Sequence, residues 1–275
     1  MVAMLATMGA CELALPVYEV ADGAADATVD QGVPDVSLDT TSDGPLDAET
    51  DASVTGCDAV GLLAYFPIDE DSGNSFHDCV ANKTAIVTGP YTWQMRAPSH
   101  PSITFLGADD AGDAGSYAIV DQSSYNFPMG GTLALWLRVD RYLSTEQIVL
   151  TTRATNNFAV GWQLIVNGNQ QSLSFLTGYG GAGGTAVGPT AGTWTHVAVV
   201  LRPGSDITFY INGASQGAQP FDAGEGSVNN DLVFGQGEQY VNGPQGKYFF
   251  YGSIDEVRIF GRPLSDAEVA ELAQQ

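Results

Sequence analysis

A carboxylate in the segment Gly252–Phe260 (GSIDEVRIF) is the first candidate for chemistry in this sequence. The segment alternates as a β-strand does, and a two-residue period places Asp255 on the same side as Val257 and Ile259. A carboxylate on an aliphatic face loses its hydration, which costs free energy unless hydrogen bonds, a cation or an ion pair compensate. We therefore expect Asp255 to have one of these partners.

The three cysteines are a second group of residues with reactive side chains. The stretch Met-Gly-Ala-Cys that ends at Cys11 resembles a bacterial lipobox. We expect residues 1–11 to be a truncated signal segment and Cys11 to carry a lipid; the alternative is an apolar tail with a free thiol. In an exported protein the remaining Cys57 and Cys79 are natural disulfide partners. Closing this loop would stabilise the fold by roughly 3 kcal/mol.

The formal net charge of −23 is unevenly distributed along the 275 residues. Residues 12–58 contain 12 acidic residues and no Lys or Arg, with Asp at many fourth positions between Gly and Pro. Such a segment has little apolar surface to bury, so we expect residues 12–56 to be a disordered acidic linker; a cation-binding tract is the alternative. The negative charge argues against nucleic acid as a partner, and against any membrane contact except through the lipid anchor.

From residue 57 to residue 275 the sequence changes to short alternating apolar runs separated by turn residues. Asn167-Gly168-Asn169 between two such runs indicates a β-hairpin. About a dozen strands without intervening helical patterns predict an all-β protein, a two-sheet antiparallel sandwich. The clearest strands are expected at residues 62–66, 102–106, 117–120, 133–139, 162–166, 173–176, 195–201, 207–211, 232–235 and 249–260.

One short helix is expected at the C-terminal end. Ser265 and Glu268 have the spacing of a capping box, and Leu264 and Val269 that of a hydrophobic staple. Leu272 continues the apolar stripe. We therefore expect this helix to pack on the sandwich and to close it.

Several segments, in this order along the chain, resemble a laminin-G-like, concanavalin A-like jelly-roll domain. They are GLLAYFPID (residues 61–69), GTWTHVAV (192–199) with ITFYING (207–213), and SIDEVRIF (253–260) with the closing helix. The resemblance implies a jelly-roll domain over residues 57–275. It does not specify the function, because this fold hosts lectins, adhesion modules and glycanases.

The features that would mark an enzyme of this family are absent. Its glycanases carry three acidic residues at alternating positions of one strand, which brings nucleophile and acid/base close together. No E-x-D-x-x-E pattern occurs, and the adjacent Asp255 and Glu256 are expected on opposite faces. His196 is expected to be packed in a strand, and no G-x-S-x-G elbow is present. We predict that the protein is not an enzyme; a degenerate glycanase is the weakest alternative.

Carbohydrate-binding modules on such sandwiches use flat aromatic faces, with polar groups or a calcium ion that orient the sugar hydroxyls. Aromatic residues in loops are the candidates here, whereas Trp136, Trp162 and Trp194 are expected in the core. The candidate ligand-binding residues are Trp93, Tyr125, Tyr179, Tyr240 and Tyr248.

The resemblance also implies a structural calcium ion. Relatives often hold one with backbone oxygens and an Asp of the final strand, which corresponds to Asp255. Asp69 and Asp78 are the candidate companions, since calcium prefers six or more oxygen ligands. The alternative is that Asp255 accepts backbone N–H bonds or pairs with an Arg, without any ion.

These observations together predict a non-catalytic recognition module that binds a glycan. A module for protein binding or structural adhesion is the alternative. We expect a monomer that is extracellular or attached to the cell envelope, as a secreted protein or an outer-membrane lipoprotein, with the acidic linker as its tether.

Overall fold

The computed structural model describes residues 53–107, 115–123, 125–127, 129–153, 160–178, 182–221, 230–239 and 246–275, all within the compact unit Ala48–Gln275. The predicted signal segment with Cys11 and nearly all of the predicted acidic linker lie outside these residues.

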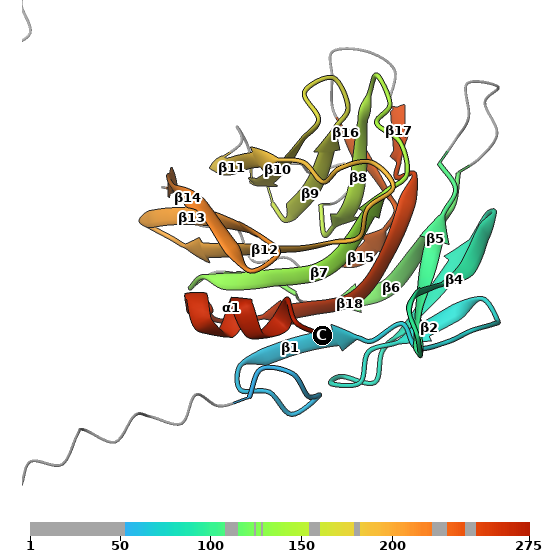
Figure 1. Cartoon of the computed structure of the whole chain (residues 1–275), viewed down its shortest axis with the longest axis horizontal. Coiled ribbons are helices and arrows are strands. Elements are labelled where there is room, and N and C mark those ends of the chain that lie inside the picture. Colours follow the sequence, from blue (N-terminus) through green and yellow to red (C-terminus); the bar gives the residue numbers. More distant parts are fainter. Residues whose placement is uncertain are drawn as a thin grey trace, which may run out of the picture. The chain divides into compact units, whose positions relative to one another are not determined.

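Two antiparallel sheets, stacked on each other, form the framework of this unit (Figure 1). The first sheet has the order β14-β13-β12-β7-β18-β5-β4, and β1 pairs with the part of β18 that β5 leaves free. Its strands are β1 (Leu62–Phe66), β4 (Tyr91–Ala97), β5 (His100–Phe105), β7 (Gly131–Val139), β12 (Thr195–Arg202), β13 (Ser205–Ile211), β14 (Ala214–Phe221) and β18 (Gly252–Phe260).

The second sheet has the order β11-β10-β9-β8-β15-β6-β3-β2. Its strands are β2 (Ser75–His77), β3 (Thr84–Thr88), β6 (Tyr117–Ser123), β8 (Glu146–Thr151), β9 (Trp162–Asn167), β10 (Ser172–Thr177), β11 (Ala182–Val187) and β15 (Asn230–Phe234). A separate short ladder joins β16 (Gln236–Gln239) and β17 (Gly246–Phe249). The predicted all-β, two-sheet antiparallel sandwich is confirmed.

The main core lies between the two sheets, because alternate side chains of each strand point inward. In β7 the inward positions Leu133, Leu135 and Leu137 are fully buried, as their alternation predicts. From the second sheet, the ring of Trp162 stacks on Phe175 with centroids 5.7 Å apart. These large buried side chains hold the two layers together through the hydrophobic effect.

A second apolar cluster covers part of the outer face of the first sheet. The helix α1 (Asp266–Leu272) lies along this sheet on the side away from β9 and β10 (Figure 1). Its Val269 and Leu272 are buried with outward-facing residues of the sheet such as Val200. The predicted capping box is confirmed, since Ser265 Oγ accepts from Glu268 N and Glu268 Oε2 accepts from Ser265 N. Such a cap stabilises a helix by about 1 kcal/mol.

A β-bulge in β18 changes the side of the sheet on which Asp255 lies. The pairing of β18 with β7 shifts between Asp255 and Arg258, and Glu256 has a φ of 54°. An extra residue in one strand moves the following side chains to the other face. Val257 and Ile259 therefore lie in the main core while Asp255 faces outward with Arg258. The prediction that Asp255 shares a face with the two aliphatic residues was wrong.

The predicted disulfide between Cys57 and Cys79 is present. It joins the segment before β1 to the loop after β2. In the same place the backbone N–H of Cys79 donates to the carbonyl of Tyr65 at 2.9 Å, so the loop is fixed to β1 by both a covalent and a hydrogen bond.

Candidate functional site

The predicted aromatic residues do not form one exposed platform. Trp93 in β4 is half-buried, packs against the main core and donates from its indole N–H to the carbonyl of Gly73 at 2.9 Å. Tyr248 in β17 is also half-buried. Both stay candidates for ligand contact. Tyr179 and Tyr240 lie outside the described residues.

Tyr125 is an interior residue, so its prediction as a ligand-binding aromatic was wrong. Its side chain is 5% exposed, and its hydroxyl donates to Asp78 Oδ2 at 3.2 Å. Its carbonyl accepts from the indole N–H of Trp162 at 2.7 Å. Tyr125 lies in the interior because these polar groups have buried partners there.

Asp78 is a structural residue and is not a companion of Asp255. Its Oδ1 accepts from the backbone N–H groups of Tyr65 and Val80, both at 2.9 Å. Its Oδ2 accepts from Ala81 N at 2.9 Å and from the hydroxyl of Tyr125. A carboxylate offers about four lone-pair positions, and all four are used. The prediction of Asp78 as a calcium ligand was therefore wrong.

Asp255 belongs to a group of buried charges on the outer face of the first sheet. Nε of Arg96, from β4, donates to Asp255 Oδ2 at 2.5 Å, and the two side chains are 6% and 1% exposed. The backbone N–H of Glu256 donates to Asp255 Oδ1 at 2.9 Å. Asp255 thus has the Arg partner and the backbone hydrogen bond that the sequence offered as the alternative to an ion.

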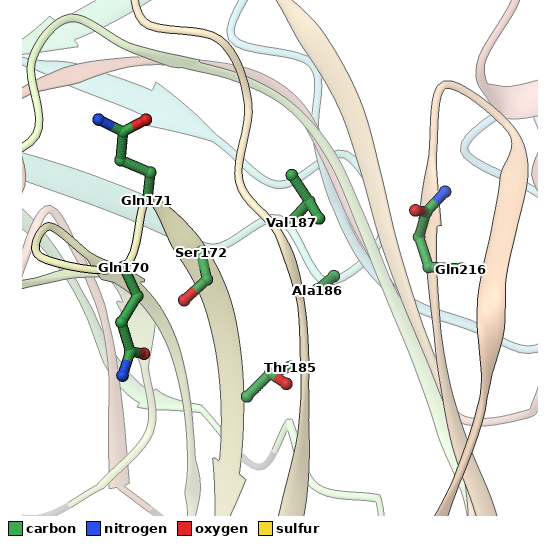
Figure 2. A pocket seen from close by; sticks show the side chains of 7 residues that line it. All are labelled: Gln170, Gln171, Ser172, Thr185, Ala186, Val187 and Gln216. Atoms are coloured by element: carbon green, nitrogen blue, oxygen red, sulfur yellow. The ribbon is translucent and has the colours of Figure 1, made fainter.

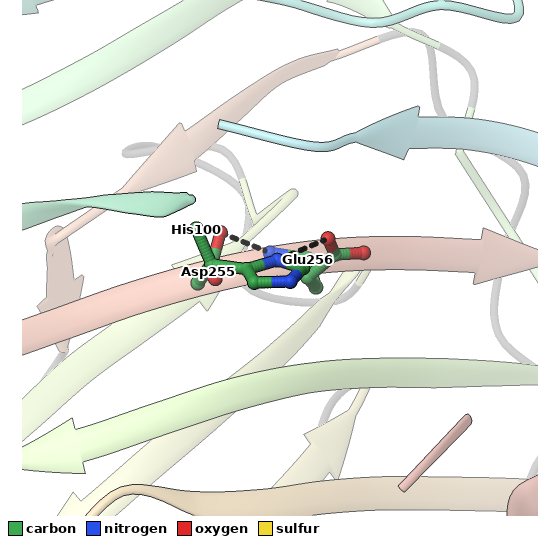
Figure 3. Close-up of side chains that lie close together, drawn as sticks. All are labelled: His100, Asp255 and Glu256. Carbon is green, nitrogen blue, oxygen red and sulfur yellow. Dashed lines mark hydrogen bonds and ion pairs between the residues drawn. The ribbon is translucent and has the colours of Figure 1, made fainter. Parts of the chain in front are cut away.

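The neighbouring Glu256 has its own set of partners. Its Oε2 accepts from the hydroxyl of Tyr65 at 2.6 Å and forms an ion pair with Nη2 of Arg258 at 2.8 Å. His100 Nδ1 lies 4.0 Å from Glu256 Oε1. Figure 3 shows His100 in front of the two carboxylates; one ligand atom from each of the three residues lies within 4.8 Å of the others. Among the described residues this is the one group with metal-ligand spacing.

Burial shifts the pKa of two carboxyl groups in this part of the molecule, those of Asp255 and Asp69. It raises the pKa of Asp255 to about 7, although the Arg96 guanidinium and the Glu256 N–H oppose the rise. Burial, followed by the nearby Glu256 and Glu70 carboxylates, also raises the pKa of Asp69. Asp69 therefore interacts electrostatically with Glu256, and its role as a companion of Asp255 stays a prediction.

Trp136 faces outward beside these charges, so the prediction that it lies in the core was wrong. The Arg96 guanidinium lies 4.6 Å from the centroid of its ring, and the His196 ring meets it edge-on at 5.6 Å. His196 is 2% exposed, as expected for a packed ring, but its Nδ1 has no hydrogen-bond partner in the described part of the chain. Trp194 is half-buried beneath Arg138, which leaves Trp162 in the core.

A cleft lies where the edges of the two sheets approach each other. It has a volume of about 460 Å³, within the range of roughly 300–1,000 Å³ typical of ligand sites. Gln170, Gln171 and Ser172 lie on one side of three residues of β11, and Gln216 of β14 lies on the other (Figure 2). The lining residues are Gln170, Gln171, Ser172, Thr185, Ala186, Val187 and Gln216.

A smaller cleft of about 160 Å³ adjoins the first and shares Gln170 with it. Its polar lining also consists mainly of amide and hydroxyl groups, with one carboxylate, that of Glu146. The lining residues are Ser144, Thr145, Glu146, Asn167, Gly168, Asn169 and Gln170. The two clefts together form a hydrogen-bonding strip on either side of Gln170, with Glu146 as its one charged lining residue. We call it the amide strip.

The backbone beneath the amide strip is held in place. Gln171 has a φ of 46°, and its carbonyl accepts from Gly188 N at 2.9 Å. Across the cleft, the Gln219 side chain bonds to both backbone groups of Thr185, donating at 2.6 Å and accepting at 3.1 Å. The Gln170 and Gln171 amides make no hydrogen bond within the described residues. Free polar groups on a fixed backbone are suited to binding a polar ligand.

Residues 84–270 match the family model of the concanavalin A-like lectin/glucanases superfamily, and the chain belongs to this superfamily. No curated protein is detectably similar to the sequence.

Solved structures share the fold. The binding domain of botulinum neurotoxin DC, in complex with rat synaptotagmin II, is 14% identical with a TM-score of 0.59, over 78% of this chain and 51% of that chain. A structure of botulinum neurotoxin type C, described as dependent on interaction with two ganglioside molecules for cell entry, has the same identity, TM-score and coverage of each chain. The chain thus spans about half the length of these neurotoxin chains.

Another similar structure is domain 4 of AbnA, a GH43 extracellular arabinanase from Geobacillus stearothermophilus, in complex with arabinotriose. It is 18% identical with a TM-score of 0.59, over 78% of this chain and 98% of that domain. At this identity the likeness shows the fold alone.

The residues of the amide strip are absent from the sequence-based candidates. The available signal was the run Asn167-Gly168-Asn169-Gln170-Gln171, in which four of five side chains are amides. It predicts a hairpin turn, and polar residues are ordinary in such turns. The other wall comes from β11 and β14, whose proximity only the folded chain reveals.

Proposed function

We propose that this protein is a non-catalytic module that binds carbohydrate at the amide strip. The observation that carries the proposal is the pair of adjoining clefts lined by side-chain amides and hydroxyl groups, with the amides of Gln170 and Gln171 unpaired within the described residues. An amide offers both a donor and an acceptor, as does each sugar hydroxyl, so the two are complementary. Val187, which is 74% exposed, adds an apolar contact for the face of a sugar ring.

The charge of the protein favours a neutral glycan. The larger cleft is lined by no charged residue, and the smaller one adds only Glu146. The formal net charge of −23 would repel sulfated or uronic acid chains. A neutral ligand avoids this repulsion and needs no counter-charge in the cleft.

The similar structures support a binding role. One was solved with arabinotriose and another with a protein, synaptotagmin II. Recognition of a protein partner is therefore the second candidate. The unpaired amides of Gln170 and Gln171 favour the glycan, since sugar hydroxyl groups satisfy donors and acceptors over a small area.

Two further parts of the proposal concern catalysis and location. The adjacent carboxylates Asp255 and Glu256 are buried and paired with Arg96 and Arg258, which supports a role in structure and not in hydrolysis.

The disulfide between Cys57 and Cys79 supports export to an oxidising compartment. Display at the cell envelope through a lipid on Cys11 and the acidic linker belongs to this proposal. Within the described residues, no helix has the length and hydrophobicity of a membrane span.

A glycan array probed with the full chain tests the proposed ligand class. We expect signals from neutral glycans that persist in 0.5 M NaCl, since binding without charge is insensitive to screening. Signals confined to sulfated or uronic acid glycans would contradict the neutral assignment. Silence across the array would contradict carbohydrate binding and leave the protein partner as the better account.

A further inference from the structure

The fold family implies a calcium ion at Asp255, yet the donor atoms of this group already have partners. Asp255 Oδ2 is bonded to Nε of Arg96 and Asp255 Oδ1 to the backbone N–H of Glu256. Glu256 Oε2 is bonded to Tyr65 and Arg258. Calcium requires six or more oxygen ligands, and of these two carboxylates only Glu256 Oε1 has no hydrogen bond within the described residues. The residues present do not fit the ion.

The charges of this group are also balanced without a metal. Two buried carboxylates face two buried guanidinium groups, those of Arg96 and Arg258, whose side chains are 6% and 2% exposed. A divalent cation would add two positive charges beside them in a site with little water to screen the repulsion. The position next to Asp255 that a cation would take is occupied by Arg96.

The contacts of Arg96 hold it in this position. Its guanidinium lies over the Trp136 ring, 4.6 Å from the centroid, and Nη1 donates to the carbonyl of Gln275 at 3.0 Å. Arg96 thus connects β4 at the sheet edge with β18 at the centre of the sheet and with the segment after α1. A calcium ion that joins a loop to a final strand would make the same type of connection.

We propose that the Arg96 guanidinium is the built-in cation of this fold, taking the place of a divalent ion between β4 and β18. The protein is then independent of calcium for stability. The proposal also defines a latent metal site: once Arg96 is removed, His100, Asp255 and Glu256 present an imidazole nitrogen and two carboxylates within 4.8 Å of one another. Carboxylates suit Mn²⁺ and Ca²⁺, whereas an imidazole suits transition-metal ions, so this donor set fits Mn²⁺ better than Ca²⁺.

Thermal unfolding of the full chain at pH 8, above the pKa of about 7 of Asp255, tests this inference with CaCl₂, MnCl₂ or EDTA. For the wild type we expect the same Tm in all three. Arg96→Ala should lower the Tm by on the order of 10 °C in EDTA, because a buried charge loses its partner. Mn²⁺ should restore part of this loss, and Ca²⁺ should restore less.

Arg138→Ala is the matched control, since it removes another Arg of the first sheet with a carboxylate partner, Asp140. We expect a smaller loss for this variant and no recovery with either ion. Arg96→Lys keeps a positive charge and should stay insensitive to both ions.

Two results would overturn the inference. A wild-type Tm that rises with CaCl₂ and falls with EDTA would show a resident calcium site. An Arg96→Ala protein that folds but does not respond to either ion would refute the latent site. Should that variant fail to fold, calcium titration of the wild type by calorimetry decides the matter: no heat of binding supports the inference and stoichiometric binding rejects it.

Discussion

Protonation of the buried His196 side chain makes the stability of the folded protein depend on pH in the acid range. Burial, and then the charges of Arg258 and Arg96, lower its pKa from 6.5 to about 3. The folded state therefore binds its proton less readily than the unfolded state does. The contribution of the neutral His196 to the unfolding free energy is therefore fully present above pH 6.5, and it is lost as the pH falls toward 3.

We expect the wild type to lose on the order of 4 kcal/mol of unfolding free energy from this residue between pH 7 and pH 3, at about 1.4 kcal/mol per pH unit. In urea unfolding over this range, the unfolding free energy of His196→Gln should depend less on pH than that of the wild type. Equal pH profiles of the two proteins would contradict the assignment.

Asp255 contributes with the opposite sign. Because its folded pKa is raised to about 7, its contribution to the unfolding free energy is lost as the pH rises through 7. Comparing the wild type with Asp255→Asn isolates the contribution of Asp255.

Asp78 is the second residue with a large expected effect. Replacing it with Asn keeps the shape but places an NH₂ group opposite N–H and O–H donors. We expect Asp78→Asn to lower the unfolding free energy by about 2–4 kcal/mol, because buried donors lose their acceptor. Asp71→Asn, at an exposed loop position, is the control and should change little. Urea unfolding that finds the two variants equal would rule out the structural role of Asp78.

The wrong prediction of the sheet face on which Asp255 lies shows a limit of reasoning from sequence alternation. Alternation predicts a face only while every residue has extended backbone angles. Glu256, with its positive φ, breaks the alternation, and nothing about its side chain signals this since Gly is the usual residue there. The need of Asp255 for a partner was predictable; which partner it has depends on Arg96, 159 positions away.

Among the elements, the strands with buried alternating residues were predictable and several edge strands were not. β7 and β12 match the expected ranges within two residues. The edge strands β4, β11 and β14 were not predicted, and neither were β3 and β8, which lie inside the second sheet. β11 (AGGTAV) contains two glycines, and β14 (ASQGAQPF) contains Gly and Pro and is mostly exposed. An edge strand needs to bury only one side, so its sequence carries a weaker pattern.

These unpredicted edges form one wall of the amide strip, and Gln219 holds them together. Its amide makes two hydrogen bonds to the backbone of Thr185 and so joins β14 to β11 across the two sheets. We expect Gln219→Ala to lower the unfolding free energy by about 1 kcal/mol and to speed amide hydrogen exchange in β11. Gln216→Ala, on the same strand but bonded only within its own turn, should leave exchange in β11 unchanged. Unchanged exchange in Gln219→Ala would contradict the clamp.

For the whole molecule, the sequence was sufficient for the fold class, the closing helix and the disulfide. The fold class follows from period-two alternation and the helix from the capping box at Ser265. The disulfide follows from the two cysteines that remain in an exported protein once Cys11 is assigned to the lipobox. The candidate site was not predictable in the same way. It combines a hairpin near Gln170 with β11 and with Gln216, and their meeting depends on how far each sheet edge curves toward the other.

Retardation in native gels that contain one neutral polysaccharide each tests the central claim most directly. The polysaccharides are arabinan, xylan, mannan, β-glucan and starch. The proteins are the wild type, the double variant Gln170→Ala/Gln216→Ala and a control, Gln274→Ala. Gln274 is an exposed residue on the other side of the first sheet. Losing two hydrogen-bonding side chains should weaken binding roughly tenfold or more. We expect at least one polysaccharide to retard the wild type and Gln274→Ala but not the double variant. Equal retardation of all three proteins, or of none on any gel, would contradict a carbohydrate site at the amide strip.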